Sequence, residues 1–188
     1  MKIRFPFRRY LIRLIASFFL GALLIGTAFY YSLDTKLRPT SEESISLFVA
    51  ASPEEDKSHE AWSLLKDSLS DSILQFDLYA ASPKDSNFQM QYQYRGRSSD
   101  VVILPFDLLN DDLSLFWDVP NKDAYQGKGI LVHSLDGTTN GMGDYFVYEQ
   151  KNYYAFFNVS SLHVSSLDAS KKDDEAMHLL KGFLGHSS

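Results

Sequence analysis

A run of 20 uncharged residues near the start of the chain, from Leu14 to Leu33, limits most strongly what this sequence can fold into. As a helix with a rise of 1.5 Å per residue it would be about 30 Å long, which matches the hydrocarbon core of a bilayer. Arg8, Arg9 and Arg13 precede the run, and the tyrosine pair 30–31 lies near its end. Because bases stay on the cytoplasmic side and tyrosines favour the interface, the sequence predicts one transmembrane helix with a cytoplasmic N-terminus.

Charge divides the chain at the same place. Residues 1–33 contain five bases and no acid, which leaves 13 bases against 24 acids over residues 34–188. The acidic part would repel nucleic acid, so we expect no nucleic-acid partner, whereas the basic start suits the inner face of a membrane. We expect a cytoplasmic tail over residues 1–13, a polar spacer over residues 34–44, and a domain outside the cell membrane over residues 45–185.

A cleaved signal peptide is the alternative explanation of the apolar run. The apolar part of a signal peptide is about 7–15 residues long and ends at a small-x-small site. This run is longer, and its only candidate of that kind, Gly26-Thr27-Ala28, lies inside it, so we favour an uncleaved anchor. The chain has no cysteine, which excludes disulfides, thiolate metal sites, thiol nucleophiles and a lipidated cysteine.

Two segments thirty residues apart resemble each other in the part outside the membrane. Residues 46–53 and 76–83 are both rich in strand-forming residues and both end in Ser-Pro, a pair that is typical of helix starts. An acid three residues after each serine completes a capping box. We therefore expect Ser52 and Ser82 to cap two helices, each of which follows a strand.

The first of these helices is indicated by apolar residues at helical spacing, namely Ala61, Trp62, Leu65 and Leu69. Residues 85–95 alternate as a strand does although their start signal is helical, so we interpret them as a short helix or an irregular segment. Residues 100–104 form a third strand, whose continuous apolarity favours burial on both faces, as in a parallel sheet. This order of elements is typical of right-handed βαβ units.

The second half of the domain has another character. We predict a strand over residues 129–133 and an antiparallel hairpin of residues 145–148 and 153–157. A last helix begins at Asp173, with its apolar face made by Ala176, Leu179, Leu180 and Phe183. The fold class is therefore a three-layer α/β domain, parallel at first and antiparallel later.

Few residues carry a recognisable chemistry. The five histidines show no close ligand pairing, and the chain has no P-loop, G-x-G-x-x-G or G-x-S-x-G motif. Residues 136–144 match part of an EF-hand loop, but Val147 stands where a bidentate glutamate is needed, so we expect no metal and no cofactor. Five aspartates follow the third strand, namely Asp107, Asp111, Asp112, Asp118 and Asp123. Two of them could form a carboxylate pair like that of a glycosidase, but the sequence does not give the distance between their carboxyl groups.

Three parts of the domain are similar in sequence to elements of one known family. They are residues 45–50 (ISLFVA) with the helix after them, residues 98–105 (SSDVVILP) and residues 153–158 (YYAFFN). Over residues 45–160 the chain resembles the first lobe of the extracellular solute-binding proteins of ABC importers. A full member has two lobes that close on a ligand. The resemblance therefore implies a single lobe of a periplasmic-binding-protein fold, which in this chain follows the predicted transmembrane helix.

The resemblance also implies a function and a place for a site. Together with the predicted anchor and the absence of a recognisable catalytic set, it favours a membrane-anchored accessory, not an enzyme, which contacts a protein or a ligand near ABC transporter subunits. Open α/β sheets bind ligands at the carboxyl ends of their strands, so the candidate ligand-binding residues are Ser52, Ser82, Phe106, Asp107 and Trp117. Two alternatives stay open: a hydrolase outside the membrane that uses the loop aspartates, and a sensor or scaffold domain without a small ligand.

Overall fold

The computed structural model describes the backbone of residues 7–109, 113–119, 124–136, 142–165, 167 and 174–185. Within these ranges the side chains of residues 7–12, 14, 32–37, 143 and 144 are not described. The chain divides into two compact units, residues 1–39 and residues 40–188.

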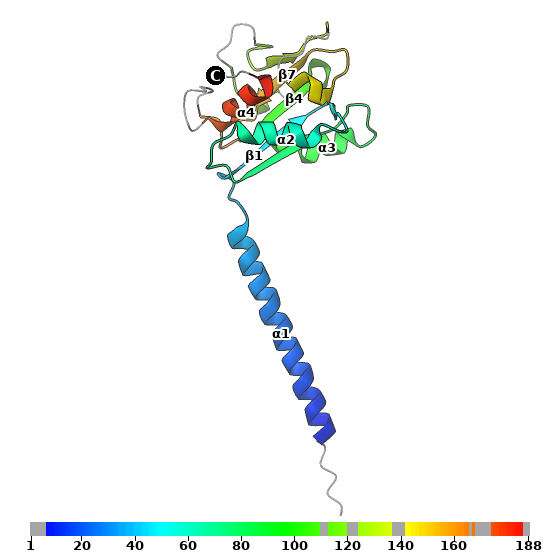
Figure 1. The fold of residues 1–188 in the computed structure, drawn as a ribbon, viewed down its shortest axis with the longest axis vertical. Helices are drawn as coiled ribbons and strands as arrows, with labels where there is room; N and C mark the ends of the chain where they lie inside the picture. Colours follow the sequence, from blue (N-terminus) through cyan, green and yellow to red (C-terminus); the bar gives the residue numbers. More distant parts are fainter. Residues whose placement is uncertain are drawn as a thin grey trace, which may run out of the picture. The chain divides into compact units, whose positions relative to one another are not determined.

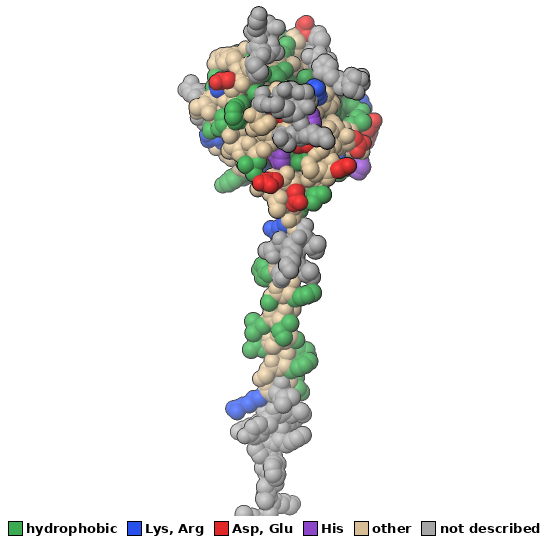
Figure 2. Space-filling view, turned by 90° about the vertical axis from the view of Figure 1, so that its left-hand side faces the viewer, with side chains coloured by type: hydrophobic (Ala, Val, Ile, Leu, Met, Phe, Trp, Pro, Cys, Tyr) green, Lys and Arg blue, Asp and Glu red, His purple; other side chains and the backbone are tan. Residues whose placement is uncertain are grey.

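The first unit contains α1 (Phe7–Leu37), a helix of 31 residues that includes the whole predicted span. Most of its described apolar side chains are exposed, with Phe18 at 71% and Ile25 at 73%, and Figure 2 shows such side chains around the helix in green. Within the described residues, no helix has both the length and the apolarity that a membrane crossing requires. The transmembrane helix over residues 14–33 therefore stays a prediction.

The second unit is built on a mixed five-stranded sheet (Figure 1). Its strands, in spatial order, are β3 (Gln75–Ala80), β1 (Ser44–Val49), β4 (Val101–Pro105), β7 (Tyr153–Phe157) and β5 (Ile130–His133). The first three are parallel, and β7 runs antiparallel to both of its neighbours. The predicted α/β class, parallel at first and antiparallel later, is therefore confirmed.

Helices cover both faces of this sheet. Phe48 of β1 contacts Phe88 and Tyr92 of α3 (Phe88–Tyr94), with ring centroids 6.2 and 5.9 Å apart. On the other face Trp62 of α2 (Ser58–Asp67) stacks on Phe76 of β3 at 6.3 Å. These faces are opposite because Phe76 pairs with Ile45, which is three residues from Phe48 along β1. The third helix, α4 (Glu175–Leu184), lies beside α2 (Figure 1).

The two Ser-Pro pairs do not cap helices, so both capping predictions were wrong. Ser52 and Pro53 form the short strand β2 (Ser52–Pro53), which pairs antiparallel with β6 (Phe146–Val147). This pairing holds the chain extended, and α2 begins only at Ser58. The Ser82 hydroxyl accepts a hydrogen bond from the backbone N–H of Lys84 at 3.3 Å, which closes a turn well before α3.

The predicted hairpin was also wrong, although its second strand exists. The strand β7 does not pair with β6; it lies between β4 and β5 in the middle of the large sheet. In a hairpin alone, one edge of this apolar strand would have no neighbouring strand. In the sheet, β7 has a strand on each side, and four of its five residues are buried. The ambiguous segment 85–95 contains a short helix, as one of its two interpretations allowed.

Candidate functional site

The carboxyl ends of the parallel strands meet at one edge of the sheet, which we call the carboxyl edge. The strand β1 lies between β3 and β4, so the chain leaves β1 toward one side and later returns on the other. In open α/β sheets, ligands bind outside the carboxyl ends at such a switch in direction. The loops after Val49, Ala80 and Pro105 are therefore the first place to look for a site.

A chain of ion pairs lies at this edge. The Lys151 ammonium is 2.8 Å from Asp107 and 2.9 Å from Glu149, and Lys84 is 3.7 Å from Glu149. Hydrogen bonds to Asp107 and Glu149 raise the pKa of Lys151 above its usual value, so Lys151 stays charged. The ion pairs connect the loop after β3, the loop after β4 and the segment before β7. The charge of Lys151 balances that of the Asp107 carboxylate.

Two exposed apolar side chains flank the same segment. The backbone N–H of Phe106 donates to the Asn152 carbonyl at 3.2 Å, and the N–H of Leu135 donates to the Asn152 side-chain oxygen at 2.7 Å. Phe106 is 47% exposed and Leu135 is 60% exposed. An apolar pair with a charged surround resembles the anatomy of a protein-binding surface. We call Phe106, Leu135, Asp107, Lys151 and Glu149 the edge surface.

The structure brings four of the five candidate ligand-binding residues to this edge. Ser52, Ser82, Phe106 and Asp107 all follow carboxyl ends of parallel strands. Trp117 does not join them: its N–H donates to the Phe157 carbonyl at 2.9 Å, and Phe157 pairs with Val101, the first residue of β4. Trp117 therefore lies at the opposite, amino edge of the sheet.

The loop aspartates do not gather either. Asp118 is 2.8 Å from Lys128 and lies next to Trp117, at the other end of β4 from Asp107. Asp111, Asp112 and Asp123 lie outside the described residues, as does most of the EF-hand-like segment 136–144. Among the described side chains, no group of three histidines or carboxylates could hold a metal ion.

Behind the edge surface lies a buried aromatic group. His133 stacks on Tyr148 with ring centroids 4.6 Å apart, and Tyr153 packs against both. The Tyr153 hydroxyl oxygen accepts the N–H of Glu149 at 3.2 Å, which fixes the start of the ion-paired segment. Burial lowers the pKa of His133 and raises the pKa of Tyr148, so both stay neutral at pH 7.

Sequence reasoning missed Glu149, Lys151 and Asn152 as parts of this site. They form the polar segment before β7, which reads as a simple hairpin turn when the partner of β7 is unknown. The available signal was the presence of lysines and carboxylates close together in the sequence. This signal was not sufficient, because only the position of β7 beside β4 brings Lys151 to Asp107.

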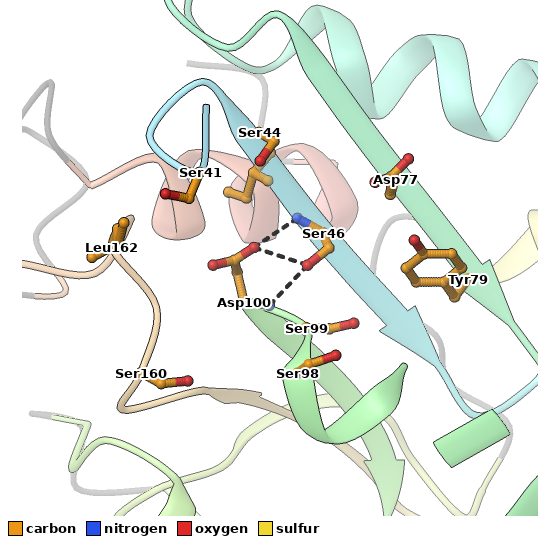
Figure 3. A pocket seen from close by; sticks show the side chains of 11 residues that line it. Ser41, Ser44, Ser46, Asp77, Tyr79, Ser98, Ser99, Asp100, Ser160 and Leu162 are labelled. Atoms are coloured by element: carbon orange, nitrogen blue, oxygen red, sulfur yellow. Dashed lines mark hydrogen bonds between the residues drawn. The ribbon is translucent and has the colours of Figure 1, made fainter. Parts of the chain in front are cut away.

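The amino edge holds a cavity of about 330 Å³ (Figure 3). Most of its wall is polar, and its residues come from the start of β1, from β3, from the approach to β4 and from the segment after β7: Ser41, Ser44, Ile45, Ser46, Asp77, Tyr79, Ser98, Ser99, Asp100, Ser160 and Leu162. Asp100 lies among these residues and beside Ser46, to which dashed lines join it (Figure 3).

Asp100 connects the elements of this edge by hydrogen bonds. One carboxylate oxygen accepts the N–H and the hydroxyl of Ser46 at 2.8 and 2.9 Å, and the other accepts the Ser161 hydroxyl at 2.6 Å. In return the N–H of Asp100 donates to the Ser46 hydroxyl oxygen at 3.2 Å. Asp100 thereby joins β1, β4 and the segment after β7.

Comparison with known proteins adds no relative to this description. No protein-family model matches the chain, and no curated protein and no solved structure is significantly similar to it.

Proposed function

We propose that this chain is a membrane-anchored accessory protein whose domain contacts a membrane protein complex through its carboxyl edge, without catalysis. The complex that the resemblance to solute-binding proteins favours is an ABC transporter. The observation that carries the proposal is the edge surface: exposed Phe106 and Leu135 stand beside a chain of neutralised charges at the switch point of the sheet.

The arrangement of the charges favours binding over catalysis. A glycosidase pair needs two carboxyl groups about 5–9.5 Å apart on the two sides of one bond. Asp107 and Asp118 lie at opposite ends of β4, and a strand of five residues is about 13 Å long. Each of these carboxylates is also 2.8 Å from a lysine, which supports a structural or interface role.

The anchor in this proposal rests on the sequence from Leu14 to Leu33, of which the structure describes the side chains of residues 15–31. The helix α1 covers the complete run, and its exposed apolar side chains support burial in another apolar environment. The bases before the run favour a cytoplasmic N-terminus and a domain outside the membrane.

The test is a pull-down of the full-length protein from gently solubilised native membranes, followed by mass spectrometry. We expect transporter permease or ATPase subunits with the wild type. Phe106→Ala should lose most of this partner, because exposed aromatic residues in the middle of an interface contribute about 2 kcal/mol or more.

Trp117→Ala is the matched control, since Trp117 is a comparably exposed aromatic residue, at 37%, on the opposite edge. Recovery of the wild-type protein alone would contradict the proposal. Equal loss of the partner with both variants would contradict the assignment to the carboxyl edge.

A further inference from the structure

The cavity at the amino edge has a hydrogen-bonding character that the proposed function does not use. Four of the serines on its wall already donate their hydroxyl protons to protein acceptors. Ser46 donates to Asp100 at 2.9 Å, and Ser160 donates to the Asn158 side-chain oxygen at 2.8 Å. Ser98 and Ser99 donate to the Arg95 carbonyl at 3.1 and 2.8 Å. A hydroxyl whose proton is engaged can only accept, so Ser98, Ser99 and Ser160 present lone pairs to a ligand. The Ser46 oxygen already accepts the N–H of Asp100.

The charges of the wall have one sign. Asp77 and Asp100 line the cavity, and no lysine, arginine or histidine does so among the described residues. Arg95 lies over the Tyr79 ring, with its guanidinium carbon 4.5 Å from the ring centroid, and is not part of the wall. The Tyr79 phenol is engaged with Asp77, so among the described wall residues the hydroxyls of Ser41 and Ser44 remain as side-chain groups that could donate. The cavity is therefore rich in acceptors, poor in donors and negatively charged.

Three ligand classes can be compared with this wall. An anion would face two carboxylates without a neutralising base, which costs Coulomb energy. A neutral polyol needs donors as well as acceptors, and most donors here are engaged. A primary ammonium group brings three donors, no acceptor and a positive charge, which complements the wall in each respect.

We propose that the amino-edge cavity binds a small organic amine through its primary ammonium group, with Asp77 as the main charge partner. The Asp77 carboxylate is half-buried on β3, and it accepts hydrogen bonds from the Gln75 side chain, at 2.8 Å, and from the Tyr79 hydroxyl. Asp100 contributes its charge from the wall, although both of its oxygens are already hydrogen-bonded. This site lies at the opposite edge from the edge surface and does not depend on it.

The test uses the full-length chain in detergent micelles and isothermal titration calorimetry with cadaverine, a five-carbon diamine. Pentane-1,5-diol, which has the same length and no charge, is the matched ligand. We expect saturable binding of cadaverine and none of the diol.

Two variants then locate the site. Asp77→Asn removes the charge and keeps the shape, so the affinity for cadaverine should fall about tenfold, equal to about 1.4 kcal/mol. Asp56→Asn, an exposed aspartate outside the cavity wall, should bind as the wild type does. The proposal is overturned if wild type binds no cadaverine, if the diol binds as tightly, or if Asp77→Asn leaves the affinity unchanged. The ligand comparison on the wild type holds even where a variant fails to fold.

Discussion

At the scale of single residues, Asp100 is the side chain on which the amino edge depends most. It accepts hydrogen bonds from the backbone and the hydroxyl of Ser46 and from the hydroxyl of Ser161. Asp100→Ala would leave three partly buried donors without their acceptor, so we expect the free energy of unfolding to fall by roughly 2–4 kcal/mol.

Urea denaturation of the full-length protein measures this loss. Asp100→Asn keeps one acceptor oxygen and should lose less than Asp100→Ala. Equal stability of Asp100→Ala and the wild type would show that these hydrogen bonds contribute no net stability.

His133 makes stability depend on pH. Burial is the main cause that lowers its pKa, while the backbone of Glu149 and the charge of Asp136 oppose the shift. Tyr148 stacks on its ring and Tyr153 packs against its edge, and both are neutral. The unfolded chain therefore binds a proton at this residue more readily than the folded chain. Stability is complete above the ordinary histidine pKa of 6.5 and is lost as the pH falls below it.

His133→Phe should reduce this pH dependence, because phenylalanine keeps the stacking on Tyr148 and cannot be protonated. We expect the melting temperature of the wild type to fall more than that of His133→Phe between about pH 7.5 and about pH 5.5. His59→Phe, at an exposed position of α2, should follow the wild type. Parallel curves for wild type and His133→Phe would contradict the role of His133.

At the scale of elements, the contact between α2 and α4 depends on a glycine. A Cβ at Gly182 would lie 2.5 Å from the Cβ of Ser68, which follows directly after α2. Alanine normally stabilises a helix relative to glycine by about 1 kcal/mol. Here Gly182→Ala should instead destabilise the protein by about 1–3 kcal/mol, because the two helices have to move apart.

Ser68→Gly supplies the matched second change. The double variant should recover part of the stability that Gly182→Ala loses, and thermal melting of the two single variants and the double variant measures the coupling. Gly182→Ala that is as stable as the wild type would contradict this close approach.

The elements that the sequence predicts well are those whose burial is visible in their own residues. All five residues of β4 are buried, as its continuous apolar run indicates, and the apolar face of α4 is the predicted one. The apolar residues of α3 stand at every second position, as in a strand, but they lie on two sides of a helix. Phe88 and Tyr92 are four residues apart and face the sheet, whereas Met90 and Tyr94, also four residues apart, are exposed.

The elements that were predicted wrongly depend on distant partners. The Ser52–Pro53 pair carries a helix start signal, but β6, more than ninety residues later, pairs with it as a strand. The insertion of β7 between β4 and β5 is equally invisible in its sequence, because an apolar strand fits any neighbour. That insertion also decides the site, since it brings Lys151 to Asp107 and takes Trp117 to the other edge.

At the scale of the whole molecule, the acidic α/β domain has two different edges. The carboxyl edge is neutralised by ion pairs and carries exposed apolar groups, which suits a protein partner. The amino edge has an open, acceptor-rich cavity with two aspartates, which suits a cation. The proposed function depends on an anchor, residues 14–33, that holds this domain outside a membrane.

Cysteine labelling can test the anchor, because the chain has no cysteine of its own. Single substitutions Ile3→Cys, before the predicted span, and Ser86→Cys, in the exposed turn before α3, are treated in intact cells with a membrane-impermeant maleimide. We predict that Ser86→Cys is labelled in intact cells and that Ile3→Cys is labelled only after the cells are broken. Labelling of both only after breakage, or release of the protein into the medium without its first residues, would contradict the anchor.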